Sequence, residues 1–202
     1  MKSPLPLAFA ALILVGATAV TTWAIAQEPG QEPMDEAAAM MKMMELAAPG
    51  KQHQQLMSRA GDWTVAARMR MAPDAPWSDM EMKVKSQAAL GGRWLISKVS
   101  GDMGGMPFDG LQIEGYNNLK QQYEAYWTDS MSTWFVSTAG QMDEQGALEM
   151  KGMMVDFVTP QGRPYRSVTT FQDADHFRTV MYDTIPPAGD VEMMTLEFSR
   201  VK

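Results

Sequence analysis

Apolar and polar residues alternate one by one along much of the chain after residue 61. Trp63, Val65 and Ala67 are separated by single polar or small residues, and residues 78–89 alternate in the same way. Successive side chains of a β-strand point to opposite faces of a sheet. The alternation therefore predicts strands with one face toward a core and the other toward water.

The same period continues to the end of the chain and is interrupted by residues typical of turns. Gly91-Gly92 and Asn117-Asn118 are two examples, and such residues allow the chain to reverse direction tightly. We therefore expect ten strands, near residues 62–71, 78–89, 93–101, 107–117, 121–129, 132–140, 147–157, 164–172, 176–183 and 192–201.

The regular spacing of these segments favours a meander of hairpins. No helical pattern separates the strands, so a parallel α/β sheet is disfavoured. About ten strands in one sheet tend to curl, and closure removes the exposed edges. We predict an all-β, antiparallel up-and-down β-barrel of about ten strands, with a two-sheet sandwich as the alternative.

One or two short helices are expected before the barrel. Residues 35–48 are rich in Ala, Met, Glu and Leu, which favour helix, and Pro49-Gly50 ends that pattern. Residues 52–60 form a second helical candidate. The predicted organisation is a helical segment at 35–60 and a barrel domain at 61–202.

The N-terminus has the pattern of a cleavable export signal. Lys2 precedes an apolar run, and Ala24-Ile25-Ala26 matches the small-x-small pattern of a cleavage site. We predict a signal peptide at 1–26, cleaved after Ala26, a linker at 27–34, and a periplasmic or secreted protein. A retained membrane anchor is the alternative. Three threonines dilute the apolar run and no basic cluster follows it, so we expect no stable membrane insertion after cleavage.

Composition narrows the function classes. The chain has 46% hydrophobic and 20% charged residues, which is typical of a folded domain. Its net charge is −7, and removal of Lys2 with the signal makes it −8. With no cluster of Lys and Arg, nucleic acid is not an expected partner. The chain has no cysteine, which excludes disulfides and thiolate chemistry.

Several motifs after residue 52 resemble one known family. Gly61-Asp62-Trp63 resembles the start of many calycin-type barrels, in which the tryptophan packs across the closed end. From residue 53 onward the chain resembles the bacterial domain-of-unknown-function family 1579, although the family more often has Asp at Asn117. The matching stretches are His53-x-x-Leu56, residues 61–63, 90–95, 106–111 and 115–118, Tyr123-x-x-x-Trp127-x-Asp129 with residues 130–133, and residues 166–168.

The resemblance implies a lipocalin-like or nitrobindin-like barrel and no established reaction. Nitrobindin-like barrels hold haem through one histidine, so haem would require His53 or His176 to point into the lumen. His176 alternates in register with Arg178, which favours a solvent-facing position. We expect His53 to pack at the barrel end and His176 to lie in a solvated turn.

Methionine chemistry is a second cofactor hypothesis. The chain has 21 methionines, whose thioethers suit Cu(I), with Met103, Met106 and residues 40–44 as candidates. Methionine is also an adaptable core filler, and we favour that role. We therefore predict no metal site and no cofactor, with haem and Cu(I) as the alternatives.

Catalysis is not indicated by a recognisable motif. A G-x-S-x-G nucleophile elbow is absent from the sequence. Glu114, Asp129 and Glu197 fall in predicted strands, but nothing in the sequence brings two of them together as an acid–base pair.

The strongest site candidate is a set of aromatic, arginine and acidic residues in or beside the family-like motifs. A barrel of this size can hold one small ligand, with polar groups fixing its orientation. The alternative is a filled barrel with an internal Arg–acid–Tyr network. The candidate ligand-binding residues are Arg93, Tyr116, Tyr123, Trp127, Asp129, Trp134 and Arg166.

The sequence thus predicts an exported binding module for a small apolar or amphipathic ligand. One alternative is a structural or envelope-interaction protein, with helix 35–48 docking a partner. Another is a hydrolase or isomerase that uses Asp129, Tyr123 or Arg93 in the same cavity.

Overall fold

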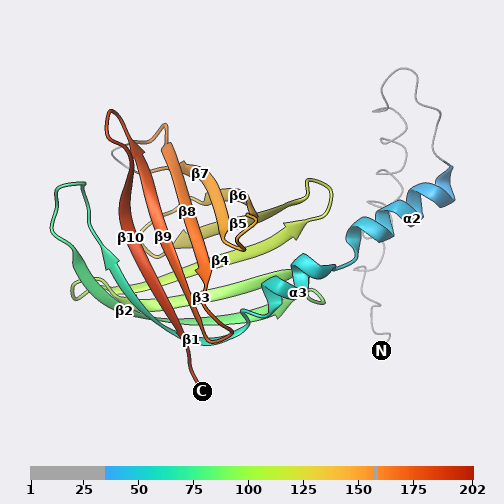
Figure 1. Cartoon of the computed structure of the whole chain (residues 1–202), viewed down its shortest axis with the longest axis horizontal. Helices are drawn as coiled ribbons and strands as arrows, with labels where there is room; N and C mark the ends of the chain where they lie inside the picture. Colours follow the sequence, from blue (N-terminus) through green and yellow to red (C-terminus); the bar gives the residue numbers. More distant parts are fainter. Residues whose placement is uncertain (1–34, 157–158) are drawn as a thin grey trace, which may run out of the picture. The chain divides into compact units, whose positions relative to one another are not determined.

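Two helices precede the barrel in the computed structural model, which describes residues 35–156 and 159–202 (Figure 1). They are α2 (Glu36–Ala47) and α3 (Lys51–Met57). The predicted signal peptide and linker lie outside the described residues. The second helix ends before residue 60 because Arg59 and Ala60 donate their N–H groups three residues back, to Leu56 and Met57. Neither described helix is long and apolar enough to cross a bilayer.

Ten antiparallel strands follow, and each pairs with its neighbours in the sequence. β10 pairs back onto β1, so the sheet closes into a barrel. The prediction of an up-and-down β-barrel is confirmed, and closure excludes the two-sheet sandwich. The strands are β1 (Gly61–Met69), β2 (Ser78–Ala89), β3 (Trp94–Asp102), β4 (Pro107–Asn117), β5 (Gln122–Asp129), β6 (Val136–Met142), β7 (Leu148–Met154), β8 (Arg163–Phe171), β9 (His176–Ile185) and β10 (Gly189–Arg200).

The start of β6 differs most from the sequence prediction. The strand was expected from residue 132 but begins at Val136. The backbone turns sharply after Asp129, because its carboxylate accepts the N–H of Met131 at 2.9 Å and its carbonyl accepts the N–H of Ser132 at 3.3 Å. An aspartate that hydrogen-bonds the backbone two residues on favours a turn over a strand.

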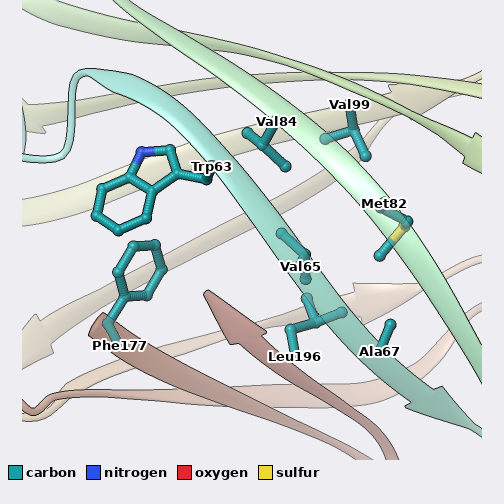
Figure 2. Packing of buried hydrophobic residues seen from close by; sticks show 8 residues of the cluster. All are labelled: Trp63, Val65, Ala67, Met82, Val84, Val99, Phe177 and Leu196. Atoms are coloured by element: carbon teal, nitrogen blue, oxygen red, sulfur yellow. The ribbon is translucent and has the colours of Figure 1, made fainter. Parts of the chain in front are cut away.

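The inward faces of the strands form the hydrophobic core. Trp63, Val65 and Ala67 of β1 are 2%, 1% and 1% exposed, as the alternation predicted. They pack against inward side chains of neighbouring strands (Figure 2). Their burial removes apolar surface from water and stabilises the closed sheet. The cluster is Trp63, Val65, Ala67, Met82, Val84, Val99, Phe177 and Leu196.

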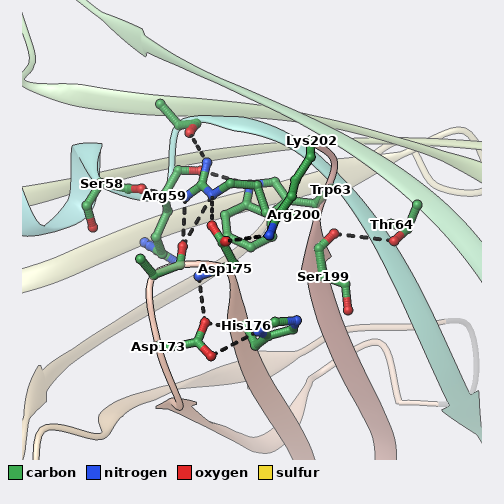
Figure 3. Close-up of polar contacts among 12 residues, drawn as sticks. Ser58, Arg59, Trp63, Thr64, Asp173, Asp175, His176, Ser199, Arg200 and Lys202 are labelled. Atoms are coloured by element: carbon green, nitrogen blue, oxygen red, sulfur yellow. Dashed lines mark hydrogen bonds and ion pairs between the residues drawn. The ribbon is translucent and has the colours of Figure 1, made fainter.

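Arg200 joins separate parts of the chain where β1 begins (Figure 3). Its guanidinium carbon lies 4.1 Å from the centre of the Trp63 ring, in a cation–π contact. Its Nη1 donates to the carbonyl of Ala60 at 2.7 Å, and its Nη2 donates to that of Ser58 at 2.9 Å. Nε donates to the carbonyl of Ala174, in the β8–β9 turn, at 3.2 Å. Arg200 therefore ties the entry to β1 to a turn over 100 residues away.

Gly61 makes room for this contact. Its φ is +134°, in a region that residues with a Cβ rarely adopt. A Cβ at this position would lie 2.5 Å from Nη1 of Arg200. The glycine of the Gly61-Asp62-Trp63 motif is therefore required by both the backbone conformation and the position of Arg200.

Replacing Arg200 should destabilise the barrel strongly. Arg200→Met removes the hydrogen bonds to the carbonyls of Ser58, Ala60 and Ala174, and we expect the free energy of unfolding to fall by about 2–4 kcal/mol. The measurement is chemical denaturation followed by circular dichroism. Arg68→Met is the matched control, because Arg68 forms an exposed ion pair with Asp79 on the outer face. Exposed pairs contribute at most about 1 kcal/mol. Equal losses in the two variants would contradict a central role for Arg200.

Candidate functional site

A cavity of about 380 Å³ lies inside the barrel, lined by inward side chains of all ten strands. Its wall is mostly apolar, and methionine is its most frequent residue. Flexible thioether side chains can adapt to ligands of different shape. The lining methionines are Met80, Met82, Met103, Met131, Met150, Met154, Met181 and Met194.

Trp127 forms a flat aromatic surface on one side of this cavity. The neighbouring strand has Gly110 beside it, and a Cβ there would lie 2.3 Å from the Trp127 ring. The ring therefore lies directly against the backbone of β4. It stacks on Phe108, with ring centres 6.3 Å apart and planes 24° apart. Its Nε1 donates to Asp129 Oδ2 at 2.9 Å, which fixes the orientation of the indole.

An ion pair lines the end of the cavity that lies near α3. Nη2 of Arg59 lies 2.9 Å from Oε1 of Glu114, and the two side chains are 13% and 11% exposed. Arg59 comes from the link between α3 and β1, and its carbonyl accepts the Trp63 indole N–H at 3.0 Å. Glu114 projects inward from β4, where its neighbours across the sheet are Leu95 and Ala125. The surroundings therefore hold both members of the pair in place.

The smaller polar side chains of the wall largely satisfy one another. The hydroxyls of Ser86 and Ser97 lie 2.7 Å apart, and those of Thr169 and Thr179 lie 2.8 Å apart. Burial raises the pKa of Tyr165 to about 12, so its phenol stays uncharged at neutral pH. These groups add polarity to the lining without adding charge.

Of the seven residues predicted from the sequence, Trp127 and Asp129 line the cavity. Tyr116 and Tyr123 form an edge-to-face pair with ring centres 4.9 Å apart, and the Tyr123 hydroxyl donates to Gln55 of α3 at 3.4 Å. These two tyrosines lie where the barrel meets α3 and are not part of the cavity lining.

Both predicted arginines lie outside the cavity lining. Arg93 follows the β2–β3 turn and donates to the carbonyl of Ala47 at 2.8 Å, which secures the chain ahead of α3. Arg166 is on the outer face of β8, because it alternates with the inward-facing Tyr165 and Ser167. There its Nε pairs with Asp190 at 2.9 Å.

Trp134 also lies outside the lining. It belongs to the β5–β6 turn, is 39% exposed, and donates its indole N–H to the carbonyl of Val155 at 2.9 Å. The tight turn after Asp129 moves this residue out of the strand in which it was predicted. Two of the seven candidates therefore line the cavity, three lie near α3, one is on the outer face of β8 and one is in the β5–β6 turn.

Arg59 is the charged cavity residue that the sequence analysis did not name. It lies between a helix and a strand, where no hydrophobic period assigns a direction to its side chain. Its partner Glu114 is 55 residues away, so local spacing does not reveal the pair. The one available signal was an arginine placed two residues before the Gly61-Asp62-Trp63 motif.

Neither histidine lines the cavity. His53 is 4% exposed, accepts the Gly50 N–H at Nδ1 at 3.0 Å, and is hydrogen-bonded to the backbone of Tyr116. Burial lowers its pKa, which favours the neutral ring. His176 is exposed beside Asp173, with Nδ1 and Oδ1 2.9 Å apart. These positions confirm that His53 packs at the barrel end and that His176 lies at a solvated turn.

The other candidate groups are also separated. Met103 lines the cavity, whereas Met106 is 54% exposed. Across residues 35–156 and 159–202, no cluster of three or more His, Asp and Glu side chains is placed to hold a metal ion.

The acidic residues of the cavity do not form an acid–base pair. Glu114 and Asp129 both line it, but Asp129 is opposite Gly110, four residues along β4 from Glu114. Four residues of strand span about 13 Å, beyond the roughly 5–10 Å that separates the carboxyls of glycosidases. Glu197 lies on the outer face, paired with Arg178 at 2.8 Å.

The fold and cavity define a closed up-and-down β-barrel with an internal, mainly apolar lumen. Residues 48–200 match the protein-family description "Protein of unknown function (DUF1579)". The chain belongs to this family, as the motifs in its sequence predicted. None of the curated proteins matches it in sequence.

A charged cluster fixes the end of the barrel opposite α3. Arg163 donates from Nε to Asp183 Oδ2 at 2.8 Å and from Nη1 to Asp156. The Thr159 N–H also donates to Asp156, at 2.7 Å. The hydrogen bond from Arg163 is the main reason that the pKa of Asp156 falls to about 2. The cluster therefore secures the β7–β8 connection by charge-assisted hydrogen bonds.

This cluster predicts a loss of stability in acid. The Asp156 carboxyl has a lower pKa in the folded protein than its ordinary value of 3.8, so it stabilises the fold above pH 3.8. The contribution is lost as the pH falls toward about 2. The unfolding temperatures of the wild type and Asp156→Asn should therefore differ near neutral pH. The two temperatures should converge as the pH falls from 3.8 to about 2.

The control is Asp79→Asn, which removes an exposed partner of Arg68 on the outer face. We expect it to change the unfolding temperature much less, because exposed pairs contribute little. A difference between wild type and Asp156→Asn that stays constant down to about pH 2 would show that the Asp156–Arg163 pair is not its source.

Proposed function

We propose that this protein is an exported carrier or receptor that binds one small apolar or amphipathic molecule inside its barrel. The observation that carries the proposal is the cavity of about 380 Å³ with its mainly apolar wall. Small-molecule pockets usually measure about 300–1,000 Å³ and combine apolar walls with a few placed polar groups. This cavity lies near the small end of that range, so it suits a single compact ligand.

Exposed apolar side chains at the end opposite α3 support entry of such a ligand there. They belong to the connections between strands or to the adjoining strand end, where charged and polar residues are usual. Exposed apolar surface around a cavity is typical of a binding site. The residues are Met71, Met106, Met131, Trp134, Phe135 and Met153.

Export is supported by the sequence. The basic start, the apolar run and Ala24-Ile25-Ala26 have the order of a signal peptide. The acids that line the cavity are not paired with each other, and the sequence has no nucleophile elbow. Both observations favour a carrier over a hydrolase.

Mass spectrometry tests both export and ligand binding. The protein is taken from a bacterium that expresses the whole chain, and its intact mass is measured. We expect periplasmic or secreted protein lacking residues 1–26. Native mass spectrometry without detergent should show an additional small mass that is lost on denaturation. A full-length mass in the membrane fraction would contradict export. An apo mass, together with no binding of an added apolar probe, would contradict the carrier function and favour a filled structural barrel.

Trp127→Ala should impair binding of the neutral fluorescent probe N-phenylnaphthylamine. The substitution removes the aromatic surface beside Gly110, and we expect affinity to fall by about tenfold or more. Trp127→Phe keeps a ring for stacking on Phe108 but loses the indole bond to Asp129, so its affinity should be intermediate.

The matched control is Trp77→Ala. Trp77 lies between β1 and β2 beneath Arg68 and Arg70, outside the cavity lining. Its replacement should leave probe affinity within about twofold of wild type. Unchanged affinity in folded Trp127→Ala would show that the probe does not bind in this cavity.

A further inference from the structure

The Arg59–Glu114 pair gives the α3 end of the cavity a specific chemistry. The structure shows one hydrogen bond between the two side chains, from Nη2 to Oε1 at 2.9 Å. A guanidinium has five N–H donors and a carboxylate can accept about four hydrogen bonds. Within the described residues, neither side chain makes another hydrogen bond in this structure. The pair therefore retains donors on one member and acceptors on the other.

The position of the pair directs this capacity toward the lumen. Both residues line the cavity and neither is more than 13% exposed. Gln112 lies two residues from Glu114 on the same inward face of β4 and also lines the cavity. Its amide adds one more acceptor and two more donors. Beyond these three residues, the lining becomes mainly aliphatic, aromatic and methionine.

We propose that the Arg59–Glu114 pair receives the uncharged polar head of an amphipathic ligand, a hydroxyl group in the simplest case. This inference rests on the proposed binding function. A hydroxyl can accept from the Arg59 guanidinium and donate to the Glu114 carboxylate. The ligand then enters head first, and its apolar part lies against Trp127 and the methionines.

The opposite charges of Arg59 and Glu114 favour an uncharged head group on the ligand. Arg59 and Glu114 together carry no net charge, so neither an anionic nor a cationic head gains a net attraction from them. A ligand carboxylate beside Arg59 would also lie near the Glu114 carboxylate, which repels it in a poorly solvated site. An ammonium group would meet Arg59 in the same way. The alcohol avoids both repulsions and keeps its hydrogen bonds.

Competition against N-phenylnaphthylamine tests this inference on the whole exported protein near neutral pH. The competitors are decanol, decanoate and decylamine, which share one chain length and differ in head group. We expect decanol to displace the probe from wild type at a concentration about tenfold lower than either charged competitor.

Charge variants separate the pair from simple partitioning into an apolar cavity. Glu114→Gln leaves Arg59 unneutralised, so decanoate should improve by about tenfold or more relative to decanol. Arg59→Gln leaves Glu114 unneutralised, so decylamine is the competitor whose affinity should rise relative to decanol in this variant. Glu149→Gln is the matched control, because Glu149 lies on the outer face and pairs with Lys151. It should keep the wild-type order.

The results distinguish two failures. If the probe binds wild type but both cavity variants keep the wild-type ratios within about twofold, the head-group assignment is wrong and the binding function stands. If neither the probe nor any competitor binds folded wild type, the binding function and this inference fail together. Thermal unfolding confirms that each variant is folded before its ratios are compared.

Discussion

The guanidinium of Arg200 connects the entry to β1, the indole of Trp63 and the β8–β9 turn. Without this connection, the first and last strands would be held together mainly by their own ladder, at the point where the barrel must close. Because Trp63 also donates to the carbonyl of Arg59, the same contact positions the arginine that enters the lumen. The same side chain therefore supports both the closure between β1 and β10 and the polar end of the cavity.

The hydroxyl groups of the cavity wall are satisfied by one another, in contrast to the Arg59–Glu114 pair. The paired hydroxyls of Ser86 and Ser97, and of Thr169 and Thr179, leave no strong demand for water. Gly110 removes a side chain where the Trp127 ring lies, so the aromatic surface occupies space beside β4 and does not block the centre. The glycine therefore leaves room for the Trp127 ring at the wall of the cavity.

The sequence predicted the features that depend on local periodicity. Alternation assigned Trp63 and Val65 inward, and the number and regular spacing of the strands predicted the closed barrel. Arg166 was assigned to the site from its motif, although its own alternation with Tyr165 and Ser167 places it outside. The sequence did not identify Arg59, because its direction depends on how a helix–strand link packs against a distant strand. Side-chain direction in strands is readable from sequence, whereas direction in links requires the fold.

The two ends of the cavity differ in rigidity as well as polarity. The backbone of Arg59 accepts the Trp63 indole N–H, and the Arg59 and Glu114 side chains are paired with each other. Toward the opposite end, Met103 and Met131 come from the connections between strands, and their side chains can change conformation at little cost. A fixed polar end discriminates between head groups because an unmatched buried polar group is penalised. An adaptable apolar end tolerates differences in the rest of the molecule. Under the proposed binding function, such a barrel would select ligands by head group and accept variation in the apolar part.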